Sequence, residues 1–249
     1  MGDSQTEGLW DGEGDNVRGW ADRFAERLAR DNPDLGYANL AVRSRRLAHV
    51  RDEQLDEALA MQPDLIGFCA GMNDVTLPGH GFGEALEVME ELYAKLAASG
   101  ATVLTTTFPD ARRIVPLAGR LIGERMDLIN DRIRACAQRY DLRLVDLFAA
   151  GSMVDLRMWS SDRLHGSPEG HRRFALAAAE ALGLEGSDHS WATPPEHTEK
   201  FRAGTVGGEI TWVTTSLGPW VWRRLRGLSG GDGRTARRPQ LAPVYAPAH

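Results

Sequence analysis

The chain has 249 residues, of which 42% are hydrophobic and 26% are charged, and it carries a net charge of −6 at pH 7. This composition fits one soluble globular domain with a substantial core, followed by an extension. The sequence has no run of about 18 apolar residues and no visible secretory signal, so no transmembrane helix is expected. The acidic charge argues against general nucleic-acid binding, which needs clustered lysine and arginine to neutralise phosphates.

Helices and strands are predicted to alternate from residue 16 onward. Apolar residues recur at helical spacing in the segments 16–33, 44–63, 82–100, 117–140 and 167–183. Short apolar runs at 36–42, 63–71, 101–109 and 142–148 predict four buried strands. The last helix has a clear start, because Ser167 is suited to the N-cap and Pro168 to the first helical position.

This alternation predicts the fold class. Strands that are joined through helices run parallel, and strands that are apolar on both faces are covered on both faces. We therefore predict a doubly wound three-layer α/β/α sandwich with a parallel sheet over residues 1–185, with ligands at the carboxyl ends of the strands. Residues 186–249 are predicted to form an extension with a short helix over 218–228 and a disordered basic tail rich in glycine, proline and arginine.

Polar residues with catalytic potential stand near the start of the chain and after the predicted strands. Ser4 lies near the start, Ser44 and Asn73 follow the first two strands, and Asp162 and His165 follow the last. Parallel strands would bring these loops to one edge of the sheet. There His165 can act as a base for Ser4, and Asp162 can orient His165. The Asn73 amide and the backbone N–H groups of Ser4 and Ser44 can stabilise a developing oxyanion.

Four short blocks carry a resemblance to a known family. They are GDSQTEG at 2–8, NLAVRS at 39–44, GMND at 71–74 and DRLH at 162–165. Each block alone occurs by chance, but together and in this order they resemble the GDSL, or SGNH, hydrolase family over residues 1–185. The resemblance implies an esterase or lipase-type serine hydrolase with a flavodoxin-like sheet and no metal or organic cofactor. It implies Ser4 as nucleophile, His165 as general base and then acid, Asp162 as its partner, and Asn73 as an oxyanion donor.

The sequence departs from the family pattern in two places. Ser44 stands where the family usually has glycine; its N–H is retained, but a positive φ would strain the turn. The family also has a hydrophobic strand before Gly-Asp-Ser, in the middle of the sheet, whereas only Met1 precedes Gly2 here. An empty internal position would leave two strand edges unpaired and an apolar groove exposed. We therefore expect the true start to lie upstream of Met1, the alternative being a damaged version of the fold.

The sequence thus predicts a serine ester hydrolase that acts through an acyl-enzyme on small or medium acyl esters, such as an acetylated sugar or a short-chain lipid. An acyltransferase or thioesterase using the same site is an alternative, and an inactive or binding protein on the same scaffold is another. Cys69 and Cys136 form no spaced motif, which favours a reduced cytoplasmic chain with buried structural thiols.

Other residues are given structural roles. Asp3 is expected to form structural hydrogen bonds in its turn rather than to act in catalysis, and His171 to pack or cap within the last helix. Trp220 and Trp222, which lie beside an arginine cluster, are expected to pack on the domain's own surface. Contact of the basic tail with a membrane surface or an anionic partner is the alternative. The expected partner is therefore a small-molecule ester, with no metal and no nucleic acid.

Overall fold

The computed structural model describes residues 1–13, 16–77, 79, 81–194, 212–219, 222, 226 and 230–244. Its α-helices are α1 (Ser4–Glu7), α2 (Trp20–Asp31), α3 (Leu47–Val50), α4 (Asp56–Ala60), α5 (Met72–Val75), α6 (Phe82–Ala98), α7 (Ala111–Ile114), α8 (Pro116–Arg139) and α9 (Pro168–Ala181). Its strands are β1 (Gly12–Glu13), β2 (Asn16–Val17), β3 (Gly36–Asn39), β4 (Leu65–Phe68), β5 (Thr102–Thr106), β6 (Arg143–Val145) and β7 (Arg238–Pro243). A π-helical turn, Arg51–Leu55, joins α3 to α4, and short 3₁₀ turns occupy Gly151–Val154, Leu156–Met158 and His189–Ala192.

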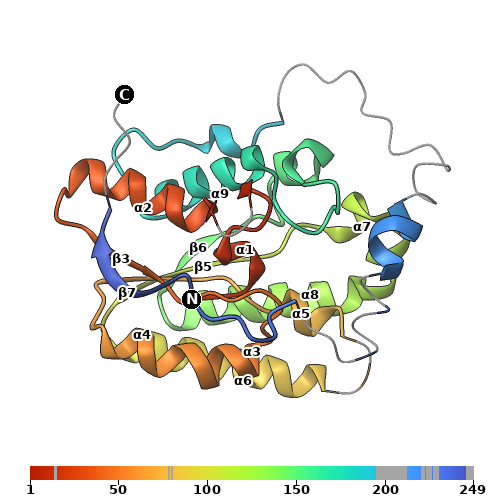
Figure 1. Cartoon of the computed structure of the whole chain (residues 1–249), viewed down its shortest axis with the longest axis horizontal. Helices are drawn as coiled ribbons and strands as arrows, with labels where there is room; N and C mark the ends of the chain where they lie inside the picture. Colours follow the sequence, from red (N-terminus) through yellow and green to blue (C-terminus); the bar gives the residue numbers. More distant parts are fainter. Residues whose placement is uncertain are drawn as a thin grey trace.

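A parallel sheet lies between two layers of helices (Figure 1). The sheet has the order β4-β5-β6, with Leu65 opposite Thr102 and Leu104 opposite Arg143. Helices α2 and α9 cover one face, where Trp20 stacks on Phe174 with ring centroids 4.3 Å apart. Helices α3, α4, α6 and α8 cover the other face. The predicted three-layer α/β/α sandwich with a parallel sheet is confirmed.

The first predicted strand does not join this sheet. Strand β3 pairs antiparallel with β7, so that Gly36 lies opposite Pro243 and Tyr37 opposite Ala242. This antiparallel pairing of β3 with β7 was not predicted from the sequence. Part of the tail that was expected to be disordered forms β7 instead. A strand with two prolines, Pro239 and Pro243, escapes a pattern search, yet it suits an edge position where a missing N–H costs no sheet hydrogen bond.

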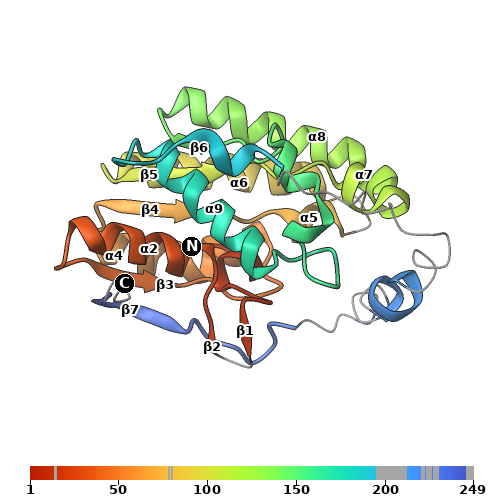
Figure 2. The ribbon, with the colours of Figure 1, turned by 90° about the horizontal axis from the view of Figure 1, so that it is seen from above.

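A groove of about 280 Å³ lies between β3 and β4 and is lined mainly by apolar side chains. The chain start enters this groove, as Figure 2 shows for the N-terminus. The Met1 ammonium donates to Gly67 O at 2.8 Å, and the Cys69 N–H donates to Met1 O at 3.3 Å. Residues 1–3 thus continue the sheet along β4 in parallel. That an apolar strand precedes Met1 stays a prediction.

The segment after α9 returns to the domain. Trp191 and Trp212 are both buried, and the Arg173 side chain donates to Trp191 O at 2.8 Å. Most of the helix predicted over 218–228 lies outside the described residues, as does Trp220. Trp222 is 57% exposed and lies under the Arg226 guanidinium. The expectation that Trp222 packs on the domain surface is therefore wrong.

Two further expectations concern the interior and the membrane. Cys69 and Cys136 are both unpaired and buried, as predicted for structural thiols. Within the ranges that the structure describes, no helix is long and apolar enough to cross a bilayer.

Candidate active site

The structure brings three of the predicted site residues into one hydrogen-bonded chain. His165 Nε2 lies 2.9 Å from Ser4 Oγ, and His165 Nδ1 lies 2.7 Å from Asp162 Oδ2. The side chains of His165 and Asp162 are 18% and 19% exposed. The site thus aligns a hydroxyl, an imidazole and a carboxylate that are partly shielded from water. Ser4 and His165 meet there although they are 161 positions apart in the sequence. This is the arrangement that activates a serine hydroxyl.

The local fold at the chain start presents Ser4. The Asp3 N–H donates to Cys69 O at 3.3 Å, at the carboxyl end of β4, and the chain then turns directly into α1. Asp3 Oδ1 accepts from the Gln5 N–H at 3.2 Å and caps this short helix. Gly2 has φ 153°, and a Cβ there would lie 2.3 Å from Cys69 O. The turn therefore needs glycine, and Asp3 has the structural role expected of it.

The loop of residues 160–165 holds Asp162 as a carboxylate. Its Oδ1 accepts from the Ser160 hydroxyl at 2.6 Å and from the N–H groups of Leu164 and His165 at 2.9 and 3.0 Å. Burial alone would raise the pKa of Asp162, but the hydrogen bonds from His165, Ser160 and Leu164 outweigh it and hold the pKa well below its usual range. Asp162 is therefore ionised at neutral pH and favours the imidazole tautomer with a proton on Nδ1.

Asn73 joins the loops that follow β3 and β4. Its Nδ2 donates to Asp3 Oδ2 at 3.2 Å and to Arg45 O at 3.1 Å. Burial raises the pKa of Asp3 to about 6, an effect that hydrogen bonds from the Gln5 N–H and Asn73 partly offset. The Asn73 amide is thus brought beside the residues next to Ser4 and Ser44, but both Nδ2 protons have protein acceptors.

Ser44 adopts the backbone conformation that a glycine would favour. Its φ is 64°, which meets the condition under which strain was expected, so the turn carries strain. The neighbouring Arg43 is fixed by Glu7, whose carboxylate accepts from the Arg43 N–H at 2.6 Å and from Arg43 Nε at 2.9 Å. The C-terminal segment covers the same turn, because a Cβ on Gly231 would lie 2.2 Å from Arg43 O. These contacts hold the turn in its strained form.

Comparisons with known proteins identify the family of the chain. A model of the GDSL-like lipase/acylhydrolase family matches residues 1–173, which is well over half of the chain. The chain belongs to this family. No curated protein matches it. The match ends within α9, so it does not include the segment that carries Trp212 and β7.

Several solved structures share the family fold at low sequence identity. An acetylxylan esterase from Geobacillus stearothermophilus is 19% identical, with a TM-score of 0.60 over 79% of this chain and 94% of that one. An α/β hydrolase from the metagenome of Lake Arreo is 22% identical, with a TM-score of 0.59 over 73% and 92%. A third, TesA, is 21% identical, with a TM-score of 0.58 over 73% and 95%. Membership of the GDSL-like family supports ester hydrolysis at the level of the family.

Two residues that the sequence did not single out contact the histidine loop of this GDSL-like fold. Gln5 Nε2 donates to Leu164 O at 2.8 Å, and Gln5 Oε1 accepts from the Gly166 N–H at 3.3 Å. Trp212 Nε1 donates to Asp162 O at 3.0 Å. Gln5 could have been found from its position next to Ser4, where an amide replaces the leucine of the GDSL motif. No signal marked Trp212, because the fold of the extension alone brings it there.

His171 has the structural role predicted for it. Its Nδ1 accepts from the Trp20 N–H at 3.2 Å, and its Nε2 donates to Leu9 O at 3.0 Å. Burial lowers the pKa of His171, so the neutral ring with one donor and one acceptor nitrogen is favoured. Both nitrogens are occupied, and His171 is not available as a second base.

Proposed function

We propose that this protein is a serine ester hydrolase that acts through an acyl-enzyme on small or medium acyl esters. Ser4 is the nucleophile, His165 the general base and then acid, and Asp162 the group that orients and stabilises the imidazolium. The observation that carries the proposal is the pair of contacts at 2.9 and 2.7 Å that links Ser4 to His165 and His165 to Asp162.

The reaction has two halves. In the first, Ser4 Oγ attacks the ester carbonyl carbon while His165 Nε2 takes the hydroxyl proton; the tetrahedral intermediate then expels the alcohol, which receives that proton from His165. In the second, His165 takes a proton from water as the water attacks the acyl-enzyme, and then returns it to Ser4 Oγ as the carboxylic acid departs. Each proton moves through the one imidazole.

The oxyanion of both intermediates needs donors. We assign this role to the backbone N–H groups of Ser4 and Ser44 and to the Asn73 side chain. The Ser4 N–H is in the first turn of α1, where a backbone donor has no partner within the helix. The Asn73 Nδ2–H that donates to Arg45 O at 3.1 Å would redirect its hydrogen bond to the substrate oxygen, with the proton remaining on the amide nitrogen.

Covalent labelling tests this proposal directly. The full chain treated with a fluorophosphonate probe should gain one adduct, and peptide mass spectrometry should place it on Ser4. The Ser4→Ala variant should gain none, and it should not hydrolyse p-nitrophenyl acetate above the background rate. Labelling at another residue, or unchanged turnover by Ser4→Ala, would show that the assignment of the nucleophile is wrong.

Gln5 is expected to act as a positioning residue for His165. Its amide bonds to backbone groups on both sides of the histidine, so the change Gln5→Leu removes both constraints without removing any reacting group. We expect kcat for p-nitrophenyl acetate to fall about 10-fold, with KM nearly unchanged, because the loop is misplaced only slightly.

A matched variant separates this effect from a general loss of stability. Gln138 is exposed on α8, so Gln138→Leu should leave kcat and KM unchanged. Gln5→Glu keeps the acceptor for the Gly166 N–H but loses the donor to Leu164 O, and it should also lower kcat. Equal kcat values for wild type and both Gln5 variants would exclude the positioning role.

A further inference from the structure

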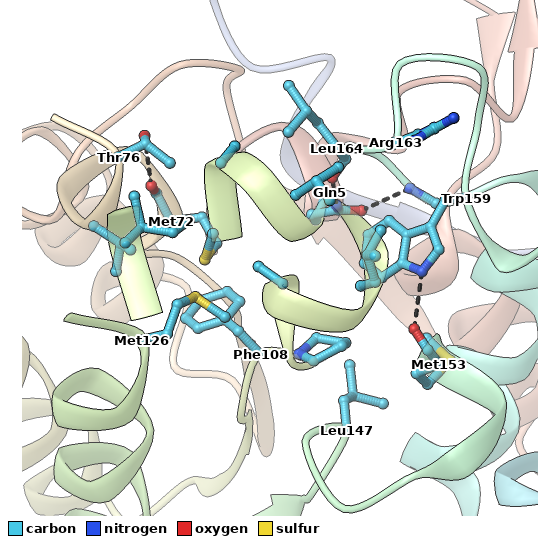
Figure 3. Close-up of a pocket in the computed structure, with 18 of the residues that line it drawn as sticks. Gln5, Met72, Thr76, Phe108, Met126, Leu147, Met153, Trp159, Arg163 and Leu164 are labelled. Carbon is cyan, nitrogen blue, oxygen red and sulfur yellow. Dashed lines mark hydrogen bonds between the residues drawn. The ribbon is translucent and has the colours of Figure 1, made fainter. Parts of the chain in front are cut away.

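A large cavity opens beside the Ser4–His165–Asp162 chain. Its volume is about 580 Å³, within the range of pockets that enclose small organic ligands. Gln5, which follows Ser4, forms part of its wall, and so do Leu164 and Gly166, which flank His165. Figure 3 shows this wall with Gln5, Leu164 and Trp159 on one side of the cavity and Met72 and Met126 on the other. The cavity is therefore lined by residues that directly adjoin Ser4 and His165 in the sequence.

The wall of the cavity is predominantly apolar. Alongside leucine, isoleucine and phenylalanine side chains, it includes four methionines, Met72, Met126, Met153 and Met158. Methionine side chains are flexible and polarisable, so they adapt to a ligand without a fixed shape. At the rim, the side chain of Leu121 is 88% exposed. An apolar wall with an apolar rim favours a hydrocarbon ligand, because its burial removes apolar surface from water on both sides.

The polar side chains in this wall already have partners within the protein. Thr76 Oγ1 donates to Met72 O at 2.8 Å, and Thr107 Oγ1 donates to Asp146 Oδ1 at 2.7 Å. Arg125 donates to Leu77 O and to Gly79 O, and Arg163 points away from the cavity in Figure 3. A sugar would need free donors and acceptors for its hydroxyl groups, and burying these without partners is costly.

We propose that the cavity binds the acyl chain of the substrate, an unsubstituted hydrocarbon chain on the order of eight carbons, rather than an acetyl group on a sugar. This inference rests on the proposed function, and it narrows the class of ester. The acyl group is the part assigned to the cavity because it stays bonded to Ser4 Oγ through both halves of the reaction, whereas the alcohol must leave after the first.

The ester series of p-nitrophenyl acetate, butyrate, hexanoate and octanoate tests this assignment. We expect kcat/KM to rise about fourfold for each added methylene, because each one is transferred from water to an apolar wall. A series of acetate esters with longer alcohols should show no such rise. A flat acyl series, or a rise confined to the alcohol series, would overturn the proposal.

Two different outcomes of the ester series separate the acyl cavity from the esterase activity itself. Ser4-dependent hydrolysis of the acetate with no gain for octanoate would leave the esterase in place and reject the acyl cavity. Absence of Ser4-dependent hydrolysis across the whole series would reject both.

A pair of variants on α8 tests where the acyl chain of the substrate lies in the protein. Ala118 lines the cavity, whereas Ala135 lies on the exposed face of the same helix. Ala118→Phe should lower kcat/KM for octanoate at least about 10-fold more than it lowers kcat/KM for acetate, since only the longer chain meets the new ring. Ala135→Phe should change neither. An equal loss for acetate and octanoate in Ala118→Phe would contradict the proposed position of the chain.

Discussion

Replacing His165 with alanine is expected to lower kcat for ester hydrolysis by at least about four orders of magnitude. Without the imidazole 2.9 Å from its Oγ, Ser4 keeps its proton at neutral pH, and the departing alcohol has no acid to protonate it. The measurement is the initial rate of p-nitrophenyl ester hydrolysis, corrected for the reaction of the buffer alone. The substitution removes a partly exposed side chain, so the thermal unfolding midpoint should change little.

The double variant makes this prediction sharper. Ser4 and His165 act on the same proton, so Ser4→Ala combined with His165→Ala should be no slower than either single variant. His189 is a suitable control, since its side chain is 73% exposed and its ring lies against Glu180 and Trp191. His189→Ala should retain the wild-type rate. Additive losses in the double variant would indicate that the two residues act in separate steps.

Much of this site was predictable because parallel strands determine where the loops after them lie. The runs at 63–71 and 101–109 contain β4 and β5, and the strand–helix alternation predicted that their carboxyl ends meet at one edge. Ser4, Asp162 and His165 were predicted from this convergence of loops together with the resemblance of the GDSQTEG and DRLH blocks to the GDSL, or SGNH, family. Strain at Ser44 was expected only for a positive φ, and the φ of 64° meets that condition.

The remainder depends on contacts between segments far apart in sequence. Trp212 bonds to Asp162 O, and Arg237 to Glu7 O at 2.9 Å, across separations of 50 and 230 residues. Neither contact has a periodic or local signature. Strand β7 was missed because its pairing with β3 outweighs a composition of proline and polar residues that is typical of a loop. These contacts and the strand β7 are determined by long-range tertiary interactions and not by local sequence propensity.

Among the residues that the structure describes, the groove between β3 and β4 leaves one edge of β4 partly unpaired, and filling it is expected to change the stability of the fold. In a parallel ladder, alternate residues of a strand bond to opposite neighbours. Gly67 O and Cys69 N–H bond to Met1, so the Leu65 C=O and the Gly67 N–H also face the groove. We propose that an extended apolar segment joined to Met1 would continue the existing pairing along β4 and fill the groove beside β3.

An extension of five alternating valine and isoleucine residues before Met1 should therefore raise the thermal unfolding midpoint by about 5–10 °C. Each such side chain gains roughly 1.5–3 kcal/mol on full burial, and ordering its backbone costs roughly 1–2 kcal/mol, which leaves a net gain of a few kcal/mol. The control is an extension of five glycine and serine residues, which adds the same length but cannot cover the apolar groove. Equal midpoints for the two extended proteins would show that the groove does not accept a strand.

The pH dependence of stability distinguishes the effect of an added strand from the effect of the Met1 ammonium. Burial lowers the pKa of the Met1 ammonium from 8.0 to about 6, so the folded protein releases a proton that the unfolded chain still holds between these values. Its stability should therefore rise from pH 6 to pH 8, by roughly 2–3 kcal/mol from this group. Both extensions replace the ammonium with an amide and should remove that rise, whereas only the apolar extension should raise the midpoint at pH 8. Urea unfolding of the three proteins at pH 6 and pH 8 measures both effects. If the rise persists in the extended proteins, it comes from histidines elsewhere and not from a charged group held inside the sheet.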